Sequence, residues 1–130
     1  MELKRKTFPG TFIDLHHTIA AAGGDRLIYY SCRFHCSESM RLAALLGYDG
    51  PVKVWFDGRQ MFHYRNGINP AVIDAQKIRF EAAKGEHELL IALGTNDGKA
   101  WGIFLRLERL DVAPKQLKRK SEAIIFPELL

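Results

Sequence analysis

Histidines and cysteines are the residues of this sequence that could hold a metal ion. His16 and His17 are neighbours, so on a strand they would point to opposite faces and could not share an ion, and the same holds for His35 and Cys36. In an extended segment Cys32 and Cys36 would lie about 13 Å apart, whereas a disulfide needs less than about 7 Å. We therefore expect two free, buried cysteines and no metal ion held by these histidines.

Paired carboxylates are the second group able to do chemistry, because two of them can cleave a glycosidic bond. The candidates all fall in turns or at strand ends, where aspartate commonly bonds its own backbone. They are Asp57, Asp74, Asp97 and Asp111. The chain has no Gly-x-Ser-x-Gly, P-loop or His-Glu-x-x-His motif. We predict no catalytic residue. The alternative is a small hydrolase or lyase using Asp97 or His63, which turnover on glycans would support.

The tryptophans indicate binding rather than catalysis. Trp55 has the parity of Lys53 and Asp57, so its ring is expected on the outer face of its strand. Tyr29 and Arg33 are expected on an outer face nearby. An exposed ring can stack on the apolar face of a sugar while polar side chains bond its hydroxyls. This outer face is one candidate ligand site, unless a loop or tail covers Trp55.

Loops at one end of the domain form the second candidate site, which we favour because binding residues gather on loops that a rigid scaffold holds. Trp101 follows a polar loop of Thr, Asn, Asp and Gly. It either closes the end of the domain as structure or forms a platform for a ligand. The residues expected at this site are Arg65, Asn66, Asn69, Asn96, Asp97 and Trp101.

Strands must position these residues, because alternation of apolar and polar side chains dominates the sequence. Asp57-Gly58 is a strong signal for a tight hairpin turn. The segment from Ser39 to Leu46 has the composition of a strand or a short helix, and we prefer the strand. The predicted strands are Thr11–His17, Arg26–Cys36, Ser39–Leu46, Val52–Asp57, Gln60–Tyr64, Lys77–Ala82, Glu88–Leu93 and Trp101–Leu110. About eight short strands without an amphipathic helix indicate an all-β fold, an antiparallel β-sandwich of jelly-roll type.

Length and charge limit the other functions. The 130 residues suffice for a single domain, 1–130, with peripheral tails at 1–10 and 112–130. The net charge of +4 comes from basic runs in these tails, which lack interleaved aromatic residues, so we expect no nucleic-acid partner. No apolar run approaches the roughly 18–20 residues of a membrane span. No signal peptide is visible, so the domain would be cytoplasmic if complete, and secreted or periplasmic if cut from a larger protein.

Four segments, Val52–Phe62, Asn69–Asp74, Ala83–Ile91 and Asn96–Gly102, carry a family resemblance over nearly half of the chain. They resemble the jelly-roll, galactose-binding-like domains that accompany glycoside hydrolases of the β-galactosidase and β-glucuronidase type. His87 stands where those domains usually have Asn. The resemblance implies a galactose-binding-domain-like sandwich, an accessory role beside a catalytic glycosidase domain and, in some relatives, a structural calcium ion. It transfers architecture better than function.

These observations predict a non-catalytic carbohydrate-binding module of a glycan-processing system, with a carbohydrate ligand and no cofactor other than such a calcium ion. The alternative is a ligand-free accessory or assembly domain that mediates protein–protein contacts. In that case the apolar segment Ile124–Leu130 would dock a partner chain, whereas otherwise it packs back on the sandwich.

Overall fold

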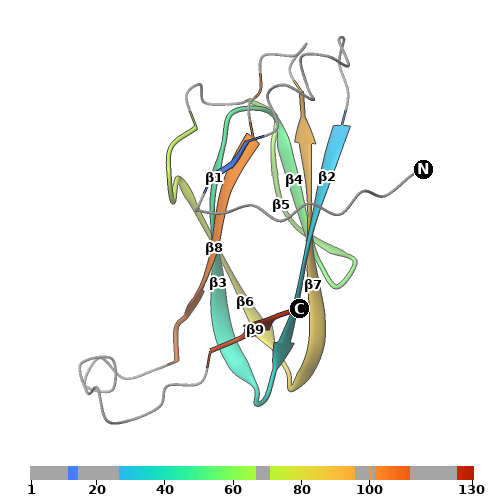
Figure 1. Cartoon of the computed structure of the whole chain (residues 1–130), viewed down its shortest axis with the longest axis vertical. Helices are drawn as coiled ribbons and strands as arrows, with labels where there is room; N and C mark the ends of the chain where they lie inside the picture. The colour runs from blue at the N-terminus through green and yellow to red at the C-terminus, as the bar shows by residue number, and fades with distance from the viewer. Residues whose placement is uncertain (1–11, 15–26, 67–70, 96–99, 101, 112–125) are drawn as a thin grey trace.

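A computed structural model describes residues 12–14, 27–66, 71–95, 100, 102–111 and 126–130. Within these residues the chain forms nine strands and no helix, in two antiparallel sheets that face each other (Figure 1). The strands are β1 (Phe12–Asp14), β2 (Leu27–Cys36), β3 (Met40–Tyr48), β4 (Val52–Phe56), β5 (Arg59–Tyr64), β6 (Gln76–Ala82), β7 (Gly85–Gly94), β8 (Gly102–Arg109) and β9 (Glu128–Leu129). The predicted all-β fold is therefore confirmed as two packed antiparallel sheets.

The first sheet has the strand order β1-β8-β3-β6, and the second has the order β5-β4-β7-β2-β9. β4 and β5 form a hairpin within the second sheet, around Asp57 and Gly58, which both have positive φ. Every other connection between consecutive strands passes from one sheet to the other. The connections therefore gather at the two ends of the sandwich.

Strand boundaries follow the predicted alternation, which confirms one ambiguous strand and leaves one informative difference. The segment that could have been a short helix is strand β3, which lies between β8 and β6. β7 begins at Gly85, three residues before the predicted start, because Glu86 and His87 still pair with His35 and Phe34 of β2.

The core lies between the inner faces of the two sheets. Phe34 of β2, Phe56 of β4 and Phe80 of β6 pack against one another, with ring centroids 4.5–6.4 Å apart. Each such ring contributes about 1.5–3 kcal/mol when it is fully buried. These three side chains therefore join the sheets at the end of the sandwich near the β2–β3 turn.

The chain end returns to the second sheet through backbone pairing. Glu128 and Leu129 of β9 pair with His35 and Phe34 of β2, and the Leu130 amide donates a 2.9 Å hydrogen bond to the Arg33 carbonyl. The prediction that this segment packs back on the sandwich is confirmed for these residues. The side chain of Leu129 remains 67% exposed, so the backbone provides the contact.

The segment that leads into β6 lies on the outer face of the first sheet. A Cβ atom at Gly47 would overlap the Val72 carbonyl oxygen and touch the ring of Phe104, so only glycine fits beneath this segment. Arg106 of β8 binds the same segment through Asp74. Its Nε donates a 3.0 Å hydrogen bond to Oδ1 of Asp74, and its Nη2 donates a 2.7 Å hydrogen bond to Oδ2.

Candidate functional site

The outer face of the second sheet presents one of the two predicted ligand sites. The strand register forms a row across four strands, His63, Lys53, Ala92 and Tyr29. Trp55 lies in the neighbouring row, where it pairs with Leu90 of β7. Trp55 and Tyr29 therefore share this face, as their parity in the sequence suggests.

Lys53 and Trp55 form a contact on this face. The Lys53 ammonium lies 5.8 Å from the centroid of the Trp55 ring, which is within cation–π range. Both side chains are half-buried, whereas Tyr29 is 44% exposed. The face thus combines two aromatic rings with a cation that shares the row of Tyr29 and contacts the ring of Trp55.

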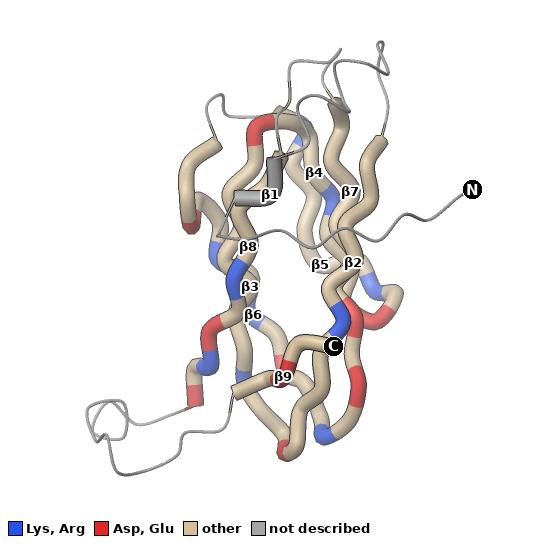
Figure 2. The backbone as a smooth tube through the Cα atoms, viewed as in Figure 1, with Lys and Arg blue, Asp and Glu red and all other residues tan. Residues whose placement is uncertain are grey.

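In the half of this face nearest the β2–β3 turn, polar side chains of β2 and β7 contact one another. Arg33, a predicted site residue, lies 3.6 Å from the Glu86 carboxylate, and the Ser31 hydroxyl donates a 2.9 Å hydrogen bond to Glu88. Figure 2 shows that the acidic positions of β7 lie in the lower part of that strand. The Arg33 guanidinium is therefore paired with a carboxylate of the same face.

A β-bulge in the β4–β5 hairpin sets which residues reach this face. Gln60 is opposite Trp55 and Phe62 is opposite Val54, which leaves Met61 as an extra residue in β5. Without the bulge, Gln60 and Phe62 would lie on the same face, because side chains alternate along a strand. With it, Phe62 packs on the core while Gln60 and His63 flank the outer face.

The predicted loop site is described only in part. Arg65 and Asn66 follow β5 directly and are exposed. Four further predicted residues lie outside the described residues, namely Asn69, Asn96, Asp97 and Trp101. Tyr64 pairs with Val52, and Val52 pairs with Leu93, so the loops after β5 and β7 start from the same end of the sandwich. This matches the expectation that they share one end.

A group of aromatic residues next to Arg65 was missed in the sequence analysis. The rings of Phe62 and Tyr64 are stacked 6.5 Å apart, and Tyr48 meets Tyr64 edge-on at 5.8 Å. Tyr64 is 40% exposed. The spacing of two aromatic residues in β5 was a signal for this group, but the contribution of Tyr48 comes from the other sheet.

Three of the four candidate catalytic aspartates have structural partners, and Asp97 lies outside the described residues. Asp57 accepts a 2.8 Å hydrogen bond from the Glu88 amide. Hydrogen bonds from Arg106 lower the pKa of Asp74, and hydrogen bonds from Arg109 lower the pKa of Asp111. Each of these three carboxylates thus fastens a turn or a strand end, as expected for aspartate in such positions.

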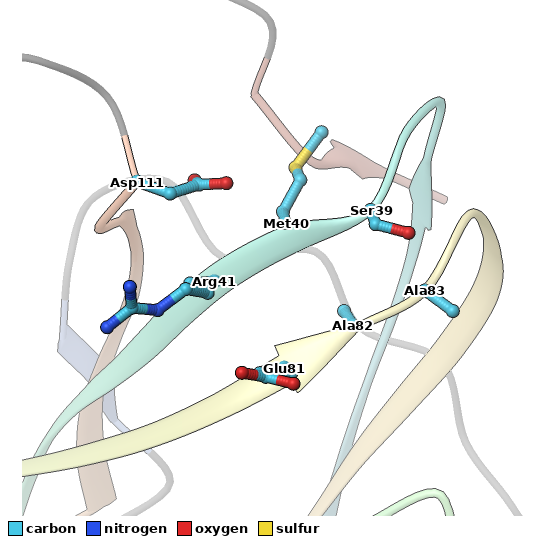
Figure 3. A pocket seen from close by; sticks show the side chains of 7 residues that line it. All are labelled: Ser39, Met40, Arg41, Glu81, Ala82, Ala83 and Asp111. Atoms are coloured by element: carbon cyan, nitrogen blue, oxygen red, sulfur yellow. The ribbon is translucent and has the colours of Figure 1, made fainter.

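An open groove of about 450 Å³ lies at the opposite end of the sandwich from the predicted loops. Figure 3 shows its lining residues, which are Ser39, Met40, Arg41, Glu81, Ala82, Ala83 and Asp111. Asp111 is bound to Arg109 at 2.8 Å, and the side chain of Met40 is almost fully buried. None of these lining residues is aromatic, so the groove offers no ring on which a sugar could stack.

Metal-binding residues do not cluster in the described part of the chain: it holds no group of three or more His, Cys, Asp or Glu side chains arranged for an ion. Cys32 and Cys36 are free, as their spacing predicts. Among the described residues there is also no helix long and apolar enough to cross a membrane.

Comparison with known proteins adds no further constraint. A scan against protein-family models found no match, and a search of the curated proteins found none either. The argument for function therefore depends on the geometry described above.

Proposed function

We propose that this chain is a carbohydrate-binding module of jelly-roll type and that its ligand lies on the outer face of the second sheet. The topology supports the jelly-roll assignment. Sheets ordered β1-β8-β3-β6 and β5-β4-β7-β2, with connections that cross between them, correspond to the eight-stranded double-sheet arrangement. In a glycan-processing system such a module would hold substrate near a separate catalytic glycosidase domain.

The observation that carries the proposal is the placement of Trp55 and Tyr29 on one outer face, with Lys53 in contact with the Trp55 ring. A sheet holds such rings rigidly, so little side-chain freedom is lost when a sugar stacks on them. The ammonium of Lys53 and the imidazole of His63 supply directional hydrogen bonds beside the rings.

The end of β5 is a second candidate location. There Tyr64 presents a ring that Phe62 and Tyr48 hold in place, and Arg65 and Asn66 follow with exposed polar side chains. This location belongs to the loop site that the sequence analysis favoured.

A glycan array with the whole chain, with and without calcium, tests the proposal and separates the two locations. Tyr29 and Tyr64 are a matched pair, because their exposed fractions are 44% and 40%. We expect a selective hit that Trp55→Ala and Tyr29→Ala abolish and that Tyr64→Ala and Trp101→Ala leave intact. Circular dichroism verifies that each variant remains folded.

If Tyr64→Ala and Trp101→Ala abolish the hit while Trp55→Ala and Tyr29→Ala leave it intact, the ligand binds at the loop end. If the hit requires calcium, binding depends on the calcium ion that the family resemblance implies. Silence across a broad array would reject carbohydrate binding and favour the assembly domain. The exposed side chains of Phe126, Leu129 and Leu130 support that alternative. It predicts self-association or partner binding that Leu129→Asp weakens.

A further inference from the structure

We infer that the sugar bound on the outer face of the second sheet is anionic, with carboxylate or sulfate groups. This inference rests on the proposed function and names the class of its ligand. It starts from the row formed by His63, Lys53, Ala92 and Tyr29.

Two basic side chains stand directly opposite each other in this row. Lys53 and His63 are cross-strand partners, so an ammonium and an imidazole lie side by side on this face. Within the described ranges neither residue has a carboxylate at ion-pairing distance. An anion between them could accept a hydrogen bond from each side chain.

Several other cations of the described residues pair with carboxylates. Arg33 pairs with Glu86, Arg106 with Asp74, and Lys77 with Glu108 at 3.6 Å. These three cations are neutralised by nearby carboxylates, whereas Lys53 and Arg65 have no such ion pair within the described residues. Lys53 instead contacts the Trp55 ring, which is an electron-rich surface but not a counter-ion.

The contact between Lys53 and Trp55 explains how one ligand would use both residues. The Lys53 ammonium lies over the Trp55 ring, 5.8 Å from its centroid, so a pyranose that stacks on the exposed part of the indole has its ring substituents beside the ammonium. A carboxylate or sulfate on that sugar would form a charge-assisted bond with the ammonium. The ring contributes to affinity for any sugar, and the ammonium contributes the preference for an acidic one.

Negative charge on the same face directs the path of the ligand. Glu86 and Glu88 occupy the half of β7 nearest the β2–β3 turn and would repel an acidic polymer. Arg65 is exposed two residues beyond His63, at the other end of β5. We therefore expect the polymer to run from Trp55 past His63 towards Arg65.

Binding to three classes of polysaccharide tests the inference. The probes are a polyuronate, a sulfated galactan and a neutral galactan, each titrated calorimetrically at low and moderate salt. We expect at least one acidic polymer to bind about tenfold tighter than the neutral one and to weaken as salt rises. The two acidic probes distinguish a carboxylate from a sulfate ligand.

Two substitutions of the same kind provide the control. Lys53→Gln should weaken acidic-polymer binding about tenfold, because a charge-assisted bond is lost. Lys77→Gln removes a half-exposed lysine from the other sheet and should leave binding unchanged. Trp55→Ala should weaken binding to every sugar.

The failures are distinguishable. Equal binding of neutral and acidic polymers, lost in Trp55→Ala but kept in Lys53→Gln, would overturn the anionic ligand and leave the proposed function standing. No binding to any polymer would overturn both. Single-stranded DNA that binds as tightly as the acidic polymers would replace the inference with general polyanion binding.

Discussion

The imidazole of His87 and the carboxylate of Asp57 are joined by a 2.6 Å contact between Nδ1 and Oδ2. The other ring nitrogen, Nε2, lies 2.6 Å from the carbonyl oxygen of Ala83. A carbonyl and an ionised carboxylate only accept hydrogen bonds, so both ring nitrogens donate and the ring is charged. It stacks on Phe56 with centroids 5.3 Å apart, and its side chain is only 11% exposed. A charged ring thus fastens the β6–β7 turn to the β4–β5 turn.

Stability should depend on pH through this contact. Burial lowers the pKa of His87, but the bonds to Asp57 and Ala83 outweigh it, and the net pKa is raised. A raised folded-state pKa contributes stability that is fully present below the unfolded value, about 6.5, and is lost as pH rises through the folded value. We expect the unfolding free energy in urea to fall above neutral pH. The charged group facing the ring is Asp57, while β2 and β4 present Phe34 and Phe56.

His87→Gln should remove this pH dependence and lower stability by about 1–3 kcal/mol at pH 6, because it breaks a hydrogen bond to a charged group. His63→Gln is the control, since His63 is exposed on the outer face of the second sheet. Parallel pH profiles for wild type and His87→Gln would contradict the assignment.

Gly47→Ala should destabilise the fold by about 1–3 kcal/mol, the usual cost of overpacking. The added Cβ would overlap the Val72 carbonyl and force the segment before β6 away from the sheet. Gly94→Ala is the matched substitution, because its Cβ would meet the Pro51 ring at an ordinary 3.4 Å. Urea unfolding of both variants measures the difference, and equal losses would show that this segment does not lie against Gly47.

The Asp74–Arg106 contact should make the same segment sensitive to acid. Hydrogen bonds from Arg106 lower the pKa of Asp74, so their contribution is present above the ordinary value and is lost as pH falls through the folded one. The protection of the Ala75 amide from hydrogen exchange, measured relative to its intrinsic rate at each pH, should fall below about pH 4, because this amide bonds the Val72 carbonyl. Unchanged protection in acid would rule out a role for the ion pair.

The two thiols should react at different rates. Cys36 is fully buried and Cys32 half-buried, and burial raises the pKa of both, although Arg109 partly offsets this at Cys36. Alkylation followed by mass spectrometry should label Cys32 slowly in the folded protein and Cys36 only on unfolding. Rapid labelling of Cys36, or a mass that indicates a disulfide, would disagree with the buried free thiol.

Alternation predicted the sheets well because it reports which face of a strand is buried. In β2 the parity of Phe34 and Cys36 identified the core, and in β4 the parity of Trp55 identified the outer face. Asp57-Gly58 marked the hairpin because few residues adopt positive φ easily. These are local properties, and one segment of sequence contains them.

Pairing between distant strands could not be predicted in the same way. The row that joins Lys53, His63 and Tyr29 depends on register, and the return of Glu128 to β2 depends on an open sheet edge. The role of His87 was also missed, since its partners Asp57 and Ala83 lie on two separate turns. The outer face therefore became a defined site only once strand order was known.

The extra residue in β5 also bears on how this face could evolve or be engineered. Loss of the single codon for Met61 would leave the hairpin turn and most of the apolar pattern in place. Gln60 would stay opposite Trp55 and Phe62 opposite Val54, now as consecutive residues of a regular ladder, because side chains alternate along a strand. Libraries that seek new ligand preferences could therefore vary residue type at positions 53, 60 and 63 in a hairpin with or without the extra residue.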